Sequence, residues 1–313
     1  MTTSICLLVR SPFDDPENGV EFARAALRMG LAPRFGAMDT LGLRNGMVVC
    51  DTYIPSLTKS GELHIAPEPQ NMPLRTFDHV QVLSFGRRGA FLDKLQLLRL
   101  LAETTPVANS VDALMHLNSK YYMAGMSDVF RYPETYASCD ADYLWSVVAS
   151  PDAPADEKWI VKPPAEAFGR DVFLISRTDT NARAILHTMT GNGEGRYCLL
   201  QRYVPEIRQG EVRVLMAAGK VVGQYRRKAV HDHRTNLAQG ASSEPCSLSA
   251  EEAALCERLG TWLMERGVSF AGIDLVFPYV IEFNVLSPGG IRTIRDLTGT
   301  DLAETVLGHI LWH

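Results

Sequence analysis

The segment 272–284 restricts the folds open to this chain more than any other part of the sequence. Two apolar, β-prone runs flank Pro278, and they carry Asp274 on one side and Glu282 and Asn284 on the other. A hairpin centred on Pro278 places Asp274 opposite Glu282, since each lies four residues from the proline. Strand alternation then puts Asn284 on the face of Glu282.

This hairpin would bring two carboxylates and one amide oxygen together on one face of a sheet. Carboxylates that lie close together repel each other, and a hard divalent cation is a common remedy. Oxygen ligands suit Mg²⁺, which also binds substrate phosphates. The pattern therefore favours a magnesium site, against the alternative that the three residues are separate, solvated strand positions.

Isolated cations occupy constrained positions elsewhere in the chain. Lys162 ends a predicted strand over 158–162 and precedes a proline, whereas Lys120 lies near the start of a short helix. Either ammonium group can contact phosphate oxygens as a point charge, and a solvated lysine is the competing interpretation. Arg213 lies in the middle of a strand between apolar residues, where a half-buried guanidinium needs an anion.

The segment 201–206, Gln-Arg-Tyr-Val-Pro-Glu, passes from a predicted strand into a proline turn. Such a crease often joins two domains, and its backbone groups can pair with the edge of an adenine base, although an ordinary strand end is the alternative. The segment 287–290, Ser-Pro-Gly-Gly, can present backbone N–H groups to a carboxylate. Late in the chain, further polar residues are available to anions: Arg227, Arg234, Asn236, Arg292 and Arg295. The cluster His231-Asp232-His233 is interpreted as a polar loop, because no third metal ligand has suitable spacing.

The composition excludes several classes of protein. The 313 residues include 31 Lys and Arg against 36 Asp and Glu, and this mild negative charge argues against a general nucleic-acid binder. The six cysteines show no CxxC spacing, which predicts reduced thiols and no zinc or redox motif. No apolar run approaches the ~18 residues of a membrane helix, and the run 5–9 is too short for a signal peptide. We therefore expect a cytoplasmic protein that binds neither membranes nor nucleic acid.

The first third alternates strand and helix patterns, which predicts a parallel α/β layer. Strands are expected at 4–9, 80–85 and 107–109. Farther along, strands are expected at 158–162, 172–175 and 199–204. Ser249 and Glu252 form a capping box that begins a helix ended near Gly267, and a hairpin and a terminal helix complete the chain. Divisions between units are expected near residues 112 and 205.

In this order the pieces resemble the ATP-grasp fold and, more closely, the bacterial glutathione synthetase family. The resemblance is strong over 118–313 and loose over 1–117. It rests on the runs 197–205, 210–215, 234–240, 272–274, 282–288 and 291–292. It implies an α/β ATP-grasp fold with three parts: an N-terminal parallel-sheet pre-ATP-grasp domain at 1–112, a central lid subdomain at 113–205 and a C-terminal subdomain with the metal site at 206–313.

The resemblance also implies roles for individual residues. Its nucleotide-binding positions match Lys120, Lys162, Gly169, Gln201, Arg202, Tyr203, Val204 and Glu211. Its metal ligands match Asp274, Glu282 and Asn284, and its catalytic positions at the transferring phosphate match Arg213, Arg227 and Asn236. Ser287, Gly289 and Arg292 match substrate-binding positions. The cofactors implied are ATP and Mg²⁺, with two ions expected and Mn²⁺ as an alternative metal, in a homo-oligomer (dimer or tetramer).

The activity implied is that of a carboxylate–amine ligase, which forms an amide through an acylphosphate and releases ADP. Its substrates would be an amino acid or small peptide, in specialised biosynthesis. Two alternatives remain open. The chain can be a glutathione synthetase proper, or a non-catalytic nucleotide-binding protein of the same fold.

Two departures from the family bear on the substrate. The phosphate-covering loop at 164–171 keeps one glycine where the family has several, which reduces its access to φ > 0 conformations. Arg87 and Arg88 stand where the family has an acidic loop, and 287–290 lacks the family's Ser-Pro-Thr-Cys. We therefore expect substrates other than γ-glutamylcysteine and glycine, with Arg87 and Arg88 binding an anionic group or a different donor.

Overall fold

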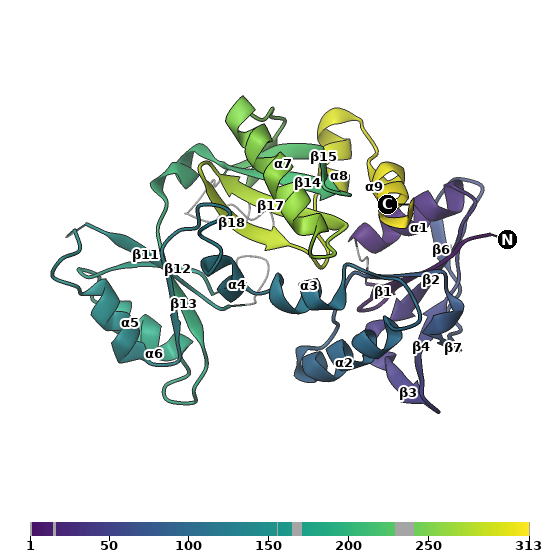
Figure 1. Ribbon diagram of the computed structural model, residues 1–313, viewed down its shortest axis with the longest axis horizontal. Coiled ribbons are helices and arrows are strands. Elements are labelled where there is room, and N and C mark those ends of the chain that lie inside the picture. Colours follow the sequence, from purple (N-terminus) through teal and green to yellow (C-terminus); the bar gives the residue numbers. More distant parts are fainter. Residues whose placement is uncertain (1, 15–16, 155, 165–170, 229–240, 313) are drawn as a thin grey trace.

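The computed structural model describes residues 2–14, 17–154, 156–164, 171–228 and 241–312. Figure 1 shows three groups of elements: an N-terminal group in purple and blue, a middle group in teal, and a C-terminal sheet in green and yellow that lies between them. Each group is built on its own sheet. None of the helices in these residues combines the length and apolarity needed to cross a membrane.

The N-terminal sheet is mixed. Strand β1 pairs in parallel with β2 and β8, and β8 pairs in parallel with β9, which confirms the predicted parallel layer. The antiparallel strands β3, β4 and β7 extend it on one side and were not predicted. The strands, in spatial order, are β3 (Gly42–Arg44), β4 (Met47–Tyr53), β2 (Ala32–Ala37), β1 (Ser4–Val9), β8 (His79–Val82) and β9 (Val107–Ala108), with β7 (Gln70–Pro73) paired to β4. A separate hairpin joins β5 (Pro55–Leu57) to β6 (Leu63–Ile65).

Helices and short turns accompany this sheet. The segment after β1 forms helix α1 because its apolar residues recur at helical spacing on one face. Gly30, with φ of +73°, follows the end of the helix. The helices of this part are α1 (Glu17–Arg28), α2 (Phe91–Leu101) and α3 (Val111–His116). The 3₁₀ turns are η1 (Met38–Thr40), η2 (Leu74–Thr76) and η3 (Arg88–Ala90).

The middle sheet has a hydrophobic core of its own. Leu144 of α5, Trp159 of β11 and Leu186 of α6 are among the buried residues that form it. Its strands, in spatial order, are β10 (Thr135–Ser138), β13 (Cys198–Arg202), β11 (Lys158–Lys162) and β12 (Phe173–Ser176). The helices here are α4 (Lys120–Ala124), α5 (Ala141–Val148) and α6 (Ala182–Met189), and η4 (Pro205–Gln209) leads to the next sheet.

The C-terminal sheet is antiparallel throughout and packs one face on α7. The predicted capping box of Ser249 and Glu252 is present at the start of α7. The strands, in spatial order, are β16 (Ser242–Glu244), β15 (Lys220–Lys228), β14 (Glu211–Ala217), β17 (Phe270–Val276) and β18 (Tyr279–Asn284). The helices are α7 (Ala250–Met264), α8 (Ile291–Thr298) and α9 (Ala303–Trp312).

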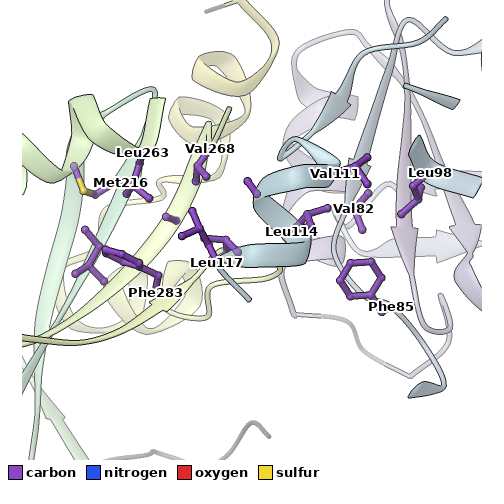
Figure 2. Close-up of a cluster of buried hydrophobic side chains, with 14 of the residues drawn as sticks. Val82, Phe85, Leu98, Val111, Leu114, Leu117, Met216, Leu263, Val268 and Phe283 are labelled. Carbon is purple, nitrogen blue, oxygen red and sulfur yellow. The ribbon is translucent and has the colours of Figure 1, made fainter. Parts of the chain in front are cut away.

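The N-terminal and C-terminal sheets share one hydrophobic core. Figure 2 shows Val82 and Leu98 on one side, Leu114 of α3 in the middle, and Met216 and Phe283 on the other side, all within one buried cluster. The middle sheet contributes its own cluster instead. The unit boundaries at residues 112 and 205 stay a prediction.

A buried asparagine ties the same two sheets together. The Asn109 Nδ2 donates to the carbonyl oxygens of Phe270 (2.7 Å) and Val285 (2.6 Å). Its Oδ1 accepts from the backbone N–H groups of Ser269 (2.8 Å) and Phe270 (3.0 Å). The residue after β9 is therefore hydrogen-bonded to the start of β17 and to the residue after β18 in the C-terminal sheet.

Candidate active site

One row of side chains crosses four strands of the C-terminal sheet. Tyr225 of β15, Arg213 of β14, Asp274 of β17 and Glu282 of β18 are successive register partners, which places their side chains on one face. The predicted pairing of Asp274 with Glu282 across Pro278 is confirmed. The alternate residues of these strands are apolar and pack on α7, so the polar residues must lie on the opposite face.

Asp274 is the buried centre of the row. The Arg213 Nη2 donates to its Oδ2 (3.0 Å), and the Arg227 Nη2 lies 2.8 Å from its Oδ1. Burial by itself would raise the pKa of Asp274, but the two arginines outweigh burial and hold this pKa well below its ordinary value. Arg227 also pairs with Glu211 across β14 and β15 (2.9 Å). The two arginines therefore favour the ionised form of Asp274.

Two further predicted residues join the row. The Lys120 Nζ, at the start of α4, donates to the Glu282 Oε1 (2.8 Å). The Asn284 Nδ2 donates to the Asp274 Oδ2 (3.2 Å). All three predicted metal ligands, Asp274, Glu282 and Asn284, thus lie on neighbouring strands with a predicted nucleotide lysine beside them.

These oxygen ligands fit a hard divalent cation that is bound by protein and by phosphate oxygens together. Within the described ranges, no group of three or more His, Cys, Asp or Glu side chains is arranged to hold a metal. Asp274, Glu282 and Asn284 supply two carboxylates and one amide oxygen, and Mg²⁺ is commonly held by one or two carboxylates plus substrate phosphates. A metal bound here would therefore need phosphate oxygens or water to complete its coordination.

Lys162 is the second predicted nucleotide lysine. Its Nζ, at the end of β11, donates to the Gln201 Oε1 (2.7 Å), and the Gln201 Nε2 donates to the Thr135 Oγ1 (2.9 Å). Burial, with the nearby charge of Lys120, lowers the pKa of Lys162 to about 8. The lysine is therefore a buried cation whose closest polar contact is a neutral amide.

The strand end after Gln201 leaves a backbone donor available. The N–H of Arg202 donates to the Glu134 carbonyl (2.8 Å), and that of Tyr203 donates to the Lys158 carbonyl (2.9 Å). No other described residue accepts a hydrogen bond from the N–H of Val204. Val204 is therefore the residue of this turn whose backbone N–H can serve a base edge.

The predicted substrate residues fall in two places. The Ser287 Oγ accepts from the Asn18 Nδ2 (3.0 Å), and the Gly289 carbonyl accepts from the Arg213 Nη1 (2.8 Å), so the loop adjoins the charged row. Arg292 lies on α8 beside Glu21. Arg87 and Arg88 follow β8 in the N-terminal part, where the Arg87 Nε lies 3.7 Å from the Asp39 Oδ2.

Sequence reasoning missed two residues of this region, Asn18 and Glu21 of α1. Both are almost fully buried, although Glu21 is charged. A signal was present, because Glu21 precedes Phe22 and lies within the apolar face of α1. Three predicted residues lie outside the described residues: Gly169, Arg234 and Asn236. So do the His231-Asp232-His233 cluster and residues 165–170 of the predicted phosphate-covering loop.

Comparisons with known proteins identify the family of this chain. The model of the prokaryotic glutathione synthetase ATP-grasp domain matches residues 119–299. A glutathione synthetase of Agrobacterium fabrum is 29% identical over 279 residues, covering 88% of this chain and 83% of that protein. Another, of Nitrosomonas europaea, is 38% identical over 153 residues, covering 48% of each chain.

Solved structures share the fold at low sequence identity. A D-cycloserine synthetase matches with a TM-score of 0.70 and 13% identity, covering 98% of both chains. A D-alanyl-alanine synthetase A of Vibrio cholerae matches with a TM-score of 0.62 and 13% identity, covering 99% of this chain and 97% of that one. Since the family match spans more than half of the 313 residues, the chain belongs to the prokaryotic glutathione synthetase family of ATP-grasp proteins and is an ATP-dependent, ADP-forming C–N ligase.

Proposed function

We propose that this ligase joins a carboxylate to an amine through an acylphosphate, with an amino acid or small peptide as substrate. A carboxylate oxygen attacks the γ-phosphorus of ATP and ADP leaves. The amine then attacks the acyl carbon. The single bond between that carbon and the phosphate oxygen breaks, phosphate leaves with the bonding electrons, and the amine loses a proton as the amide forms.

The observation that carries the proposal is the group of charged side chains in and beside this row. Four buried cations meet three carboxylates there: Lys120, Lys162, Arg213 and Arg227 against Glu211, Asp274 and Glu282. Within this set the cations exceed the carboxylates, and a buried cation without a matching anion is unfavourable. A triphosphate supplies the missing negative charge.

The side chains of this set divide the work of phosphoryl transfer. The rigid guanidinium groups of Arg213 and Arg227 are held by Asp274 and can face the oxygens of the transferring phosphoryl group. Lys120 and Lys162 supply point charges to the neighbouring phosphates. Phosphoryl transfer needs such positioning and charge neutralisation rather than a covalent protein nucleophile.

The family uses ATP and a divalent metal. We assign the metal site to Asp274, Glu282 and Asn284, and the metal to Mg²⁺, with two ions expected and Mn²⁺ as an alternative. When held by these residues, the ion would supply positive charge that neutralises the phosphate groups. Glu211 is assigned to the ribose hydroxyls, and the turn from Gln201 to Val204 to adenine.

The loop that carries Arg87 and Arg88 is shaped by a buried lysine. The Lys94 Nζ donates to the Asp39 Oδ1 (2.5 Å) and to the carbonyl oxygens of Phe85 (2.7 Å) and Arg87 (3.1 Å). A Cβ on residue 86 would lie 2.2 Å from the Asp39 Oδ1, so only glycine fits there. Gly86 therefore lets the loop pass close to Asp39, and Lys94 holds it there.

This loop follows the carboxyl end of a parallel strand, β8, where open α/β sheets commonly bind ligands. The Arg87 side chain is 89% exposed, so its charge is available to a solute. These features support Arg87 and Arg88 as a subsite for an anionic substrate group. The substrates would then differ from γ-glutamylcysteine and glycine.

The test is a pairwise screen of amino acids and dipeptides with Mg²⁺ and ATP, following ADP release and product mass. The expected result is one pair that gives ADP and a product equal to the two substrates less one water. Added hydroxylamine should trap the acylphosphate as a hydroxamate. ADP release without any condensed product, or no ADP release with any pair, would contradict the proposal.

A second candidate is glutathione synthesis itself, which the 29–38% identity to glutathione synthetases favours. The same screen includes γ-glutamylcysteine with glycine. Efficient glutathione formation would favour this candidate and would contradict the role proposed for Arg87 and Arg88 in binding an anionic substrate. The cytoplasmic location and the homo-oligomer stay predictions that cell fractionation and light scattering can check.

A further inference from the structure

Helix α1 belongs to the N-terminal sheet but packs against α8 and α9 at the far end of the chain (Figure 1). Two of its side chains, Asn18 and Glu21, lie almost one helical turn apart. Asn18 contacts the loop before α8, and Glu21 contacts α8 itself. They are 2% and 1% exposed. Buried polar side chains of this kind are held by specific partners.

Asn18 holds the loop that precedes α8. Its Nδ2 donates to the Ser287 Oγ (3.0 Å) and to the Pro288 carbonyl (3.0 Å). From the other side, the Arg213 Nη1 donates to the Gly289 carbonyl (2.8 Å). The loop is thus fixed between α1 and the arginine assigned to the transferring phosphoryl group.

Glu21 holds the first turns of α8. Its carboxylate accepts from the Arg292 Nε (3.3 Å) and from the Arg295 Nη1 (2.7 Å). A contact at Nε restrains the plane of a guanidinium group, and so the direction in which its other N–H groups point. The side chain of Arg292 is 34% exposed, so part of it faces solvent while Glu21 is buried beneath it.

Gly290, the last residue of the loop, also restrains its backbone. Gly290 has a φ of +135°, and a Cβ there would lie 2.9 Å from the Tyr225 ring, which belongs to the charged row. The loop is therefore held against Arg213 through the Gly289 carbonyl, and Arg292 follows it in the first turn of α8. On the proposed function, a carboxylate bound by this loop and Arg292 lies near the phosphoryl group assigned to Arg213.

We propose that Glu21 and Asn18 are positioning residues for the substrate carboxylate. Glu21 acts by orienting Arg292, and Asn18 acts by fixing the Ser287 loop. This inference rests on the proposed function, because it takes Ser287 and Arg292 as substrate contacts. It adds that the N-terminal layer, through α1, sets the geometry of a site carried by the C-terminal sheet.

The test compares the Glu21→Gln and Asn18→Ala variants with wild type, using the substrate pair that gives most ADP in the screen. Each variant should raise the KM of one carboxylate substrate roughly tenfold or more, since small misplacements at a reacting centre are costly. The KM of ATP and the melting temperature should change little. Glu304→Gln is the matched control, because Glu304 pairs with Arg28 of the same helix but does not touch the loop.

A double-mutant cycle separates orientation of Arg292 from general support. In an Arg292→Lys background, Glu21→Gln should raise the substrate KM less than twofold further, because the orienting effect has already been lost. Additive effects, or a substrate KM unchanged in both Glu21→Gln and Asn18→Ala, would overturn the proposal. A parallel rise in the KM of ATP with a lower melting temperature would assign both residues to structure. No ADP release with any pair in wild type would instead defeat the proposed function, and this inference with it.

Discussion

The Lys120 Nζ lies 2.8 Å from the Glu282 Oε1, so a lysine assigned to nucleotide phosphate is bound to a carboxylate assigned to the metal. The same exchange of roles occurs at Asp274, which pairs with Arg213 and Arg227. Each group thus satisfies the partner of the other. On the proposed assignments, ATP and its metal replace these internal contacts by phosphate and metal contacts.

This exchange predicts opposite effects of Glu282→Gln on ATP with and without metal. The variant frees Lys120 from a charged partner, so metal-free ATP should bind about three- to tenfold more tightly than to wild type. With Mg²⁺ present, turnover should fall about 100-fold or more, because a charged ligand is lost. Calorimetric titration with ATP in EDTA, and then in Mg²⁺, measures both effects.

Glu244→Gln is the control for this variant, since Glu244 pairs with Lys228 at 2.7 Å on the same sheet and away from the row. It should leave both ATP affinities unchanged. Weaker binding of metal-free ATP by Glu282→Gln, or wild-type dependence on Mg²⁺, would remove Glu282 from the metal site.

The lowered pKa of Lys162, about 8 against an ordinary 10.5, predicts a pH dependence of ATP binding. Phosphate favours the protonated lysine, so the ATP dissociation constant should be flat below pH 8 and rise up to about tenfold per pH unit above it. Lys162→Gln should bind ATP more weakly and lose this rise. Lys158→Gln, on the same strand but exposed, should keep it.

The same shift has a consequence for stability. Between about pH 8 and 10.5 the unfolded chain holds a proton on Lys162 that the folded chain has lost, so this group makes the free energy of unfolding rise with pH in that window. Denaturant titrations of wild type and Lys162→Gln at pH 7.5 and 9.5 isolate the contribution. An identical pH slope in the two proteins would show that Lys162 titrates normally.

Asp274→Asn should destabilise the fold as well as abolish turnover. The change removes the charge that balances Arg213 and Arg227, and losing one partner of a buried ion pair costs about 3–5 kcal/mol. Asp301→Asn, which breaks an exposed pair with Arg28, should cost under about 1 kcal/mol. Chemical denaturation measures both, and equal stability of the two variants would mean that the Asp274 cluster is not buried as described.

Asn109→Ala should weaken the contact between the N-terminal and C-terminal sheets. The change orphans buried backbone groups of Phe270 and Val285, for a loss of roughly 2–5 kcal/mol in the free energy of unfolding. Asn71→Ala removes an exposed hydrogen bond to Asp51 and should cost about 0.5 kcal/mol or less. Hydrogen exchange should quicken in β9 and β17 but not in the middle sheet. Uniform quickening across all sheets would contradict this division.

The Arg87 and Arg88 subsite predicts a selective effect on the substrate. Arg87→Ala and Arg88→Ala should each raise the KM of an anionic substrate about tenfold, since a charge-assisted contact is worth roughly 1.5–3 kcal/mol. The KM of ATP should stay within about twofold. Arg44→Ala, an exposed arginine on the edge strand β3, is the control. An unchanged substrate KM in both variants would show that neither arginine contacts the substrate.

Features that depend on neighbours in sequence were predictable. The strand Ser4–Val9 and the Ser249 capping box follow from periodicity and local hydrogen bonding. The pairing of Asp274 with Glu282 was predicted from a hairpin centred on Pro278. In the structure the turn pairs Val276 with Tyr279, and a register shift between Asp274 and Leu275 brings Asp274 opposite Glu282. The family resemblance supplied the order of the nucleotide and metal residues.

Features that join distant segments needed the tertiary structure. The sequence pattern of the antiparallel strands β3, β4 and β7 does not indicate which strand each one pairs with. Glu21 is 274 positions from Arg295, and Lys120 is 162 positions from Glu282, yet each pair is in contact. Local pattern indicates which face of an element is buried, but which element covers that face is decided by the packing of the whole chain. The sequence by itself therefore determined the local elements and the chemical groups of the site, and only tertiary packing decided which cation meets which carboxylate.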